Sequence, residues 1–288
     1  MAEAYDRTHG DTGNIVALEH VNVTIPDQRP ATAFYVMGLG FTRDPYLMVG
    51  LDNMWVNIGR SQCHLPTGSP MRLRGTIGIV VPDLGQLAQR LEKIAPLLAG
   101  TQFSFKVHAD RIETTCPWGN RFRCHAPGPG FGATELALAY IEFEVPRGAA
   151  DGIARFYREA LGAIAATERR GGDAVASVDA GSTQKLLFRE TDASPPPYDG
   201  HHIQIYIADF SGPHRFLAAR GLITEESNEH QYRFRDIVDP DSGKVLFTIE
   251  HEVRSLLNPL YARPLVNRNP AQTNIDYVRG HDVFRGSY

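Results

Sequence analysis

The chain has 288 residues, of which 42% are hydrophobic and 22% are charged, with a formal net charge of −4 and a pI near 6.3. This length suits two domains that each bury a core, and no apolar run approaches the roughly 20 residues of a membrane helix. The basic residues are scattered, which argues against nucleic acid as a partner. We therefore expect a two-domain globular protein that binds neither membranes nor nucleic acids.

The N-terminus and the cysteines indicate the compartment. Residues 1–14 are polar and lack the basic-then-apolar pattern of a secretion signal, so we expect a flexible segment at the start of a cytoplasmic protein. The chain has three cysteines, Cys63, Cys116 and Cys124. An odd number without C-x-x-C spacing argues against a disulfide framework and against a cysteine-bound zinc. We expect these thiols to be reduced and mostly buried.

The first half of the chain reads as two strand–helix–strand units. Residues 19–41 combine an alternating strand, a turn marked by proline, and a helix with a glycine stop, and residues 61–66 form a short strand. Residues 75–94 repeat the strand and the amphipathic helix, and residues 116–125 supply a turn and a closing strand.

The second half repeats this order. Residues 139–163 match 19–41, and 182–188 match 61–66, while 201–222 and 239–252 follow the pattern of the second unit. The sequence therefore predicts four modules in two halves.

Glycine and proline mark the boundaries between these parts. A Gly/Pro-rich linker at 125–135 separates the halves, and prolines after residue 253 are too frequent for a helix or a central strand. The predicted domains are therefore 15–127 and 136–253, followed by an extended surface tail at 254–288.

The stretches "HVNVTIPD", "SQCHLP", "IGIVVPDL" and "CPWGNRF" resemble the vicinal oxygen chelate superfamily over roughly residues 15–253. That group includes glyoxalases, fosfomycin-resistance enzymes, bleomycin-sequestering proteins and ring-cleaving dioxygenases. The resemblance implies an α+β fold of four βαβββ modules, paired into two half-open β-barrel domains around the active site.

The resemblance also implies metal ligands at the first residue of a module's opening strand and in its closing strand. Module one has His20 and His64 at these positions, and module four opens with His202. Modules two and three lack good ligands there, since the positions are occupied by Thr76, Arg123, Tyr140 and Leu186. Because fused members form sites between modules one and four and between two and three, we expect one metal site and one site without metal.

The fourth ligand depends on the register of the last strand. Glu250 in "KVLFTIEHEV" is the expected carboxylate, but strict counting from Gly243 puts Phe247 at the position. A shift or bulge is therefore required, and His251 or Glu252 could replace Glu250. Imidazoles with a carboxylate suit Fe(II), which we favour, and also Zn(II), Mn(II), Ni(II) or Co(II).

Other polar residues are expected around the metal. Strand alternation places Asn22 on the face of His20, and Gln204 and Tyr206 on the face of His202, as candidate substrate-binding groups. His230 and Tyr232, on a strand near the end of module four, are candidate acid–base groups. Ordinary strand packing is the alternative interpretation of this pair.

Three functions fit this pattern for a small, oxygen-bearing organic substrate. We prefer slightly an Fe(II)-dependent dioxygenase, in which a substrate with two adjacent oxygens and O₂ bind together. A glyoxalase- or epimerase-like lyase or isomerase would instead use the metal to polarise a carbonyl while a carboxylate moves the adjacent proton. The third is a non-catalytic small-molecule binder of the bleomycin-resistance type, and a homodimer remains open for each.

Overall fold

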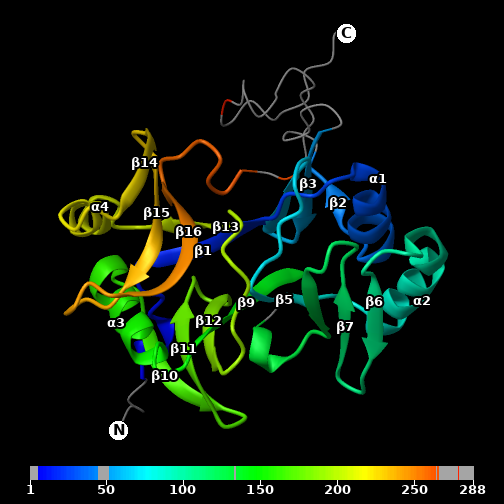
Figure 1. Ribbon diagram of the computed structural model, residues 1–288, viewed down its shortest axis with the longest axis horizontal. Coiled ribbons are helices and arrows are strands. Elements are labelled where there is room, and N and C mark those ends of the chain that lie inside the picture. Colours follow the sequence, from blue (N-terminus) through cyan, green and yellow to red (C-terminus); the bar gives the residue numbers. More distant parts are fainter. Residues whose placement is uncertain (1–5, 45–51, 133, 264, 266–277, 279–288) are drawn as a thin grey trace, which may run out of the picture.

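The computed structural model describes residues 6–44, 52–132, 134–263, 265 and 278, and places them in two eight-stranded sheets with helices packed against them (Figure 1). Within these residues, no helix is both long enough and apolar enough to cross a membrane. Four βαβββ modules follow one another along the chain, and this confirms the predicted α+β fold.

The first two modules occupy the chain up to the Gly/Pro linker. After a short η1 (Thr8–Gly10), module one contains β1 (Ile15–Asn22), α1 (Gln28–Ala31), η2 (Thr32–Gly38), β2 (Thr42–Arg43), β3 (Asn53–Ile58) and β4 (Ser61–Pro66). Module two contains β5 (Gly75–Val80), α2 (Leu84–Ile94), η3 (Ala95–Leu98), β6 (Ser104–Val107), β7 (Arg111–Thr115) and β8 (Arg121–His125).

The other two modules follow η4 (Pro129–Phe131). Module three contains β9 (Ala137–Pro146), α3 (Ala150–Leu161), β10 (Ala165–Arg170), β11 (Asp173–Asp179) and β12 (Lys185–Thr191). Module four contains β13 (His202–Ile207), α4 (Ser211–Ala218), β14 (Ile223–Asn228), β15 (Gln231–Val238) and β16 (Val245–Ser255).

Local signals explain where the helices begin and end. The Asp27 side chain accepts a hydrogen bond from the backbone N–H of Arg29 at the start of α1, and Asp83 does the same for Gln86 at the start of α2. Helix α3 is capped after Leu161 by Gly162, whose φ is 63°. This left-handed conformation is costly for a residue with a Cβ, so glycine favours the end of the helix here.

The sheets join modules that are distant in sequence. One sheet has the strand order β14-β15-β16-β13-β1-β4-β3-β2, so modules four and one meet where β13 pairs with β1. The other has the order β10-β11-β12-β9-β5-β8-β7-β6, joining modules three and two. Each sheet therefore takes one module from residues 15–127 and one from 136–253. We call the inner face of the first sheet the first cup, and that of the second sheet the second cup.

The hydrophobic core lies on the other face of each sheet, under the helices. The aromatic pairs Phe34–Tyr35 and Phe156–Tyr157 are fully buried there. The three cysteines are also buried and free, as expected.

Most of the tail expected at 254–288 lies outside the described residues, and the described part up to Arg263 packs against the protein. It makes turns up to residue 262, and the Tyr261 ring packs edge-on against Tyr206 with 4.8 Å between centroids. Arg263 is buried and donates to the Asp44 carboxylate at 2.7 Å. This segment therefore anchors module four against module one.

Candidate metal centre

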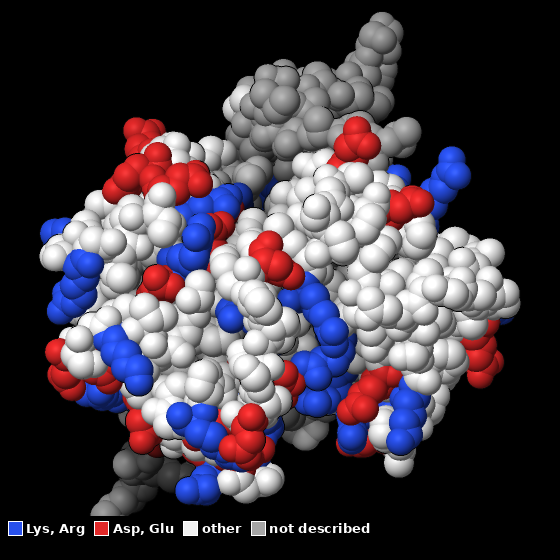
Figure 2. Space-filling model, in the orientation of Figure 1, with Lys and Arg blue, Asp and Glu red and all other residues white. Residues whose placement is uncertain are grey.

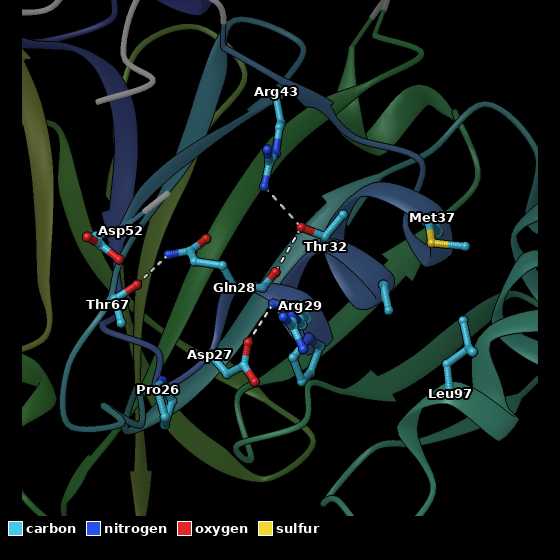
Figure 3. Close-up of a pocket in the computed structure, with 12 residues that line it drawn as sticks. Pro26, Asp27, Gln28, Arg29, Thr32, Met37, Arg43, Asp52, Thr67 and Leu97 are labelled. Carbon is cyan, nitrogen blue, oxygen red and sulfur yellow. Dashed lines mark hydrogen bonds between the residues drawn. The ribbon is translucent and has the colours of Figure 1, made fainter. Parts of the chain in front are cut away.

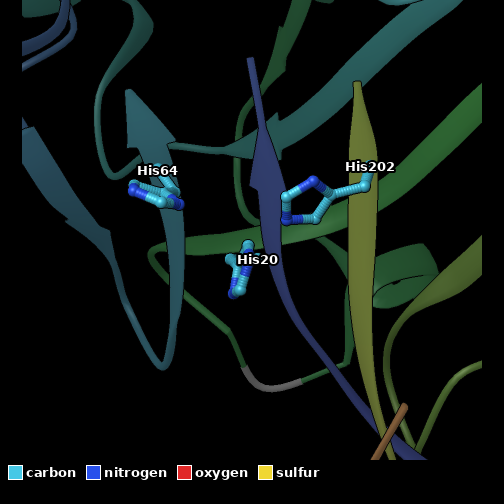
Figure 4. A group of neighbouring side chains, drawn as sticks. All are labelled: His20, His64 and His202. Atoms are coloured by element: carbon cyan, nitrogen blue, oxygen red, sulfur yellow. The ribbon is translucent and has the colours of Figure 1, made fainter. Parts of the chain in front are cut away.

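Three histidines converge in the first cup. His20, His64 and His202 each offer a ring nitrogen, and these nitrogens all lie within 4.8 Å of one another (Figure 4). Two nitrogens on one first-row ion, at about 2.0–2.1 Å from it, are about 3–4 Å apart. Small side-chain adjustments would therefore let the three imidazoles share an ion.

Strand pairing explains this convergence. Strand β1 lies between β4 and β13, and its Asn22 is paired with His64 on one side and with His202 on the other. His20 lies two residues before Asn22, so it points to the same face of the sheet. The site requires both modules, because each contributes imidazoles.

His20 is held by its neighbour Glu19. The Nδ1 atom lies 2.5 Å from Glu19 Oε2, whereas Nε2 is buried without a hydrogen-bond partner among the described residues. Burial alone would raise the pKa of Glu19. His20 and the nearby Arg254 and Arg263 outweigh burial and hold that pKa below its ordinary value. The carboxylate is therefore ionised beside the imidazole.

His64 is enclosed by amides and an indole. Its Nδ1 lies 2.6 Å from Asn22 Nδ2, and its Nε2 lies 2.7 Å from Asn53 Oδ1. The Trp55 ring stacks on the imidazole with 3.8 Å between centroids. Binding a metal through either nitrogen requires the corresponding amide to move.

Burial favours the neutral forms of His64 and His202. Burial, followed by the charge of His20 and then by nearby arginines, puts the pKa values of His64 and His202 well below the ordinary value. Metal-binding histidines must be unprotonated. The cup therefore presents them in the form that binds metal at neutral pH.

Two carboxylates flank His202. Glu250 Oε1 lies 3.8 Å from Nδ1 of His202, and Glu252 Oε2 lies 3.8 Å from Nε2. Arg233 binds both carboxylates, at 2.7 Å and 2.5 Å respectively. A further guanidinium, that of Arg254, lies 2.5 Å from Glu252.

The register distinguishes the two carboxylates. In module one, Asn22 of β1 is paired with His64. In module four, Gln204 of β13 is paired with Glu252, whereas Glu250 is paired two residues earlier, with His202. Asn22 and Gln204 each lie two residues after the opening histidine of their strand. The position in module four that corresponds to His64 is therefore that of Glu252.

His251 faces the core. Its Nε2 lies 2.6 Å from the Tyr157 hydroxyl, and its ring stacks on Phe234 with 4.3 Å between centroids. It therefore lies on the face of β16 opposite to the cup.

The expected substrate-binding residues line the first cup. Asn22 is paired with His202, and Gln204 with His20, across the junction of β1 and β13. Gln204 is fully buried, and neither atom of its amide has a hydrogen-bond partner in the described part of the chain. Tyr206 is buried further along the same face. The amide of Gln204 is thus available to a ligand in the cup.

The structure does not bring the expected acid–base pair to the histidines. Tyr232 is paired with Val253, on the core face of β15, and its ring packs with those of Phe210 and His214. His230 lies in the turn before β15, with Nε2 3.4 Å from Glu229. The alternative interpretation, strand packing, fits Tyr232.

Five residues that surround the histidines were not identified as site residues from the sequence, namely Glu19, Asn53, Trp55, Arg233 and Arg254. Period-two alternation places Arg233 on the face opposite to Tyr232, but which of the two faces the cup depends on the pairing of β15 with β16.

Solved structures share this arrangement of strands and helices. A protein from Bacillus subtilis subsp. subtilis str. 168 that carries the provisional name dioxygenase matches 85% of this chain and 86% of its own, with a TM-score of 0.58 and 15% identity. Glyoxalase I from Zea mays matches 87% of this chain and 95% of its own, with a TM-score of 0.58 and 15% identity. The chain shares the fold of these two proteins. No protein-family description and no curated protein matches the sequence.

The second cup differs in chemistry from the first. At the positions of His20 and His64, module two has Thr76 and Arg123, which lie in the paired strands β5 and β8. Module three has Tyr140 and, by the pairing of β9 with β12, Leu187. Leu186, the residue expected from the sequence, lies in the core one position earlier.

The Tyr140 ring lies across the second cup, against Gly78. A Cβ at Gly78 would lie 2.2 Å from the Tyr140 ring, so the ring occupies the space that glycine leaves. The Tyr140 hydroxyl lies 2.9 Å from His125 Nε2 and 3.4 Å from Arg123 Nη1. These contacts hold the ring in place.

Charged side chains line the rest of the second cup as ion pairs. Arg121 binds Glu144 at 2.6 Å, and Arg189 binds Glu142 at 3.1 Å. Figure 2 shows Lys and Arg side chains gathered in a hollow at the middle of this face, with Asp and Glu side chains beside them. The charges of the named pairs balance, as in a structural network.

Tyr140→Phe is therefore expected to leave metal content and turnover nearly unchanged. The loss of the hydroxyl contacts should lower the free energy of unfolding by about 1 kcal/mol. Elemental analysis and denaturant unfolding of the variant measure both quantities. A turnover loss above about tenfold (roughly 1.4 kcal/mol of activation free energy) in folded protein would place the chemistry in the second cup.

A pocket of about 920 Å³ lies elsewhere, beside α1 and η2 (Figure 3). Its polar side chains bind one another: Gln28 Nε2 lies 2.8 Å from Thr67 Oγ1, and Arg43 Nη2 lies 3.0 Å from Thr32 Oγ1. The residues that line it include none of the three histidines. This pocket is separate from the candidate metal centre.

Proposed function

We propose that the protein is a metal-dependent enzyme acting on a small, oxygen-bearing organic substrate, with the ion held by His20, His64 and His202. The observation that carries the proposal is the convergence of three imidazoles within 4.8 Å in the first cup. The buried Nε2 of His20 has no hydrogen-bond partner among the described residues, which is costly unless a ligand satisfies it. A first-row divalent metal suits these donors, and Fe(II) is our choice among them.

Glu252 is the preferred fourth ligand. It has the position that corresponds to His64, and its side chain is 4% exposed, against 14% for Glu250. The Glu252 oxygen lies 3.8 Å from His202 Nε2, within the range of two ligands on one ion. Arg233 and Arg254 balance its charge in the cup.

A metal bound here would polarise adjacent oxygen atoms of a substrate and, as Fe(II), would supply the redox chemistry that O₂ requires. The protein's own groups would orient the substrate. Gln204 offers a donor and an acceptor that no residue described by the structure uses. Trp55 is 7% exposed and forms an apolar wall against His64, so that side of the cup excludes water.

The arginine contacts of Glu250 and Glu252 favour an oxygenase over an enzyme that transfers protons. An isomerase needs a carboxylate that moves a proton between carbons. Glu250 is bound by Arg233 and lies 3.6 Å from Arg235, and Glu252 is bound by Arg233 and Arg254. Carboxylates fixed in this way are poor mobile bases. We therefore propose a dioxygenase.

Protein loaded with Fe(II) under anaerobic conditions is expected to consume O₂ when catechol or a related vicinal diol is added. An oxygen electrode measures this uptake, and iron-treated His202→Ala is the control that should consume none. No uptake, together with deuterium exchange at the carbon beside the carbonyl of an α-hydroxy carbonyl compound, would replace the oxygenase with an isomerase.

A further inference from the structure

Glu19 and His20 are neighbours in sequence that share one environment. Successive residues of a regular strand point to opposite faces, so Glu19 should point away from the cup. The pairing of β1 with β13 shifts register between Leu18 and His20. Such a bulge leaves one residue of the strand unpaired and changes the direction of its side chain. Glu19 is that residue.

The bulge puts the carboxylate at hydrogen-bond distance from the imidazole. Glu19 Oε2 lies 2.5 Å from His20 Nδ1, and the two side chains are 14% and 1% exposed. A carboxylate accepts a hydrogen bond, so in the unprotonated ring that a metal requires, the hydrogen lies on Nδ1 and the lone pair on Nε2, the nitrogen directed into the cup. The hydrogen bond fixes both the tautomer and the orientation of the ring.

The three histidines differ in the contacts of their ring nitrogens. His64 has an amide at each ring nitrogen, and His202 has carboxylates at 3.8 Å from both nitrogens. His20 combines one closely bound nitrogen with one that has no partner in the described part of the protein. It is therefore the imidazole that already has the geometry of a ligand.

We propose that Glu19 is a positioning residue, which holds His20 as the Nδ1–H tautomer with Nε2 directed at the metal. This inference rests on the proposed metal centre. A carboxylate behind a metal-bound histidine orients the ring and raises its basicity, and its loss commonly costs about 10–100-fold in metal affinity. Glu19 thereby acts through His20 and does not itself contact the ion.

The test compares the Co(II) affinity of full-length Glu19→Ala, Glu19→Gln and His20→Ala, measured by competition with a chromophoric chelator. We expect a loss of about 10–100-fold in Glu19→Ala. Glu19→Gln should lose less, because its amide oxygen accepts the same hydrogen bond without the charge. Glu144→Ala is the matched control, since it removes another part-buried, ion-paired carboxylate and should bind Co(II) normally.

A second measurement separates positioning from a general loss of structure. Long-range ¹H–¹⁵N spectra of the metal-free protein report the tautomer of His20, which should be Nδ1–H in wild type and a mixture in Glu19→Ala. Glu19→Gln conserves volume and serves this test if Glu19→Ala does not fold.

Each contrary outcome is distinct. Wild-type affinity and tautomer in both Glu19 variants, with His20→Ala losing Co(II), would overturn the role of Glu19 and leave the metal centre intact. Equal losses in Glu19→Gln, Glu19→Ala and His20→Ala would show that Glu19 is itself a ligand, which also overturns the inference. Full affinity in His20→Ala would remove the metal centre itself.

Discussion

Replacing His20 or His202 with alanine is expected to reduce the metal content of the purified protein from close to one ion per chain to a small fraction of that. Each variant removes one of the three converging nitrogen donors and leaves only two imidazoles to hold the ion. The effect should be large because the ion is bound by few protein atoms. Elemental analysis of freshly purified wild type and variants measures it.

His230→Ala is the matched control for this experiment. His230 is a part-exposed histidine in the turn before β15, outside the group of three, so its removal should leave the metal content unchanged. Thermal melts of the metal-free proteins show whether each variant is folded. Unchanged metal in both His20→Ala and His202→Ala would contradict the assignment of the site.

The second large effect is expected at Glu252. Glu252→Gln should weaken metal binding more than Glu250→Gln, because Glu252 has the position in module four that His64 has in module one. It should also lower the free energy of unfolding of the metal-free protein by about 1–3 kcal/mol, since Arg233 and Arg254 lose a buried counter-charge. Chelator competition and denaturant unfolding measure the two effects.

The reverse order of losses would restore Glu250 as the carboxylate ligand. In that case the side chain of Glu252 would serve mainly to hold the arginines. His251→Ala is the internal control on the same strand. It removes a core hydrogen bond to Tyr157 and should reduce stability without changing metal affinity.

Much of the fold could be predicted from the sequence because its signals are local and repeated. The alternation of the opening strand recurs in the four modules, and the Phe-Tyr pair recurs in modules one and three. The three histidines could be placed together because the resemblance fixes which modules meet. The structure brings them together in the expected pair of modules.

The register of the last strands could not be predicted. The pairing of β15 with β16 is irregular between Phe234 and Asp236 and again between Ile237 and Val238. Each irregularity changes which residues of β15 and β16 lie opposite each other. Neither irregularity can be recognised in the sequence. Counting along β16 from Gly243 therefore gives Phe247, and Glu250 is expected only as a carboxylate on the right strand, whereas the pairing with β13 favours Glu252.

Glu19 could not be predicted for the same reason. Alternation along β1 places it on the face opposite to His20, and the bulge that brings it to the imidazole arises from pairing with a strand more than 180 residues away. A similar limit applies to Tyr232, since the choice of face for β15 depends on its partner strand. Pairing with a distant module decides the position of Glu19, and pairing with β16 in the same module decides that of Tyr232.

The most direct test of the metal centre is an anomalous-scattering map from crystals of the metal-loaded protein, collected at the absorption edge of the bound element. The account predicts one strong peak within about 2.0–2.2 Å of nitrogen atoms of His20, His64 and His202. A peak at other side chains, with these imidazoles still bound to their protein neighbours, would contradict it.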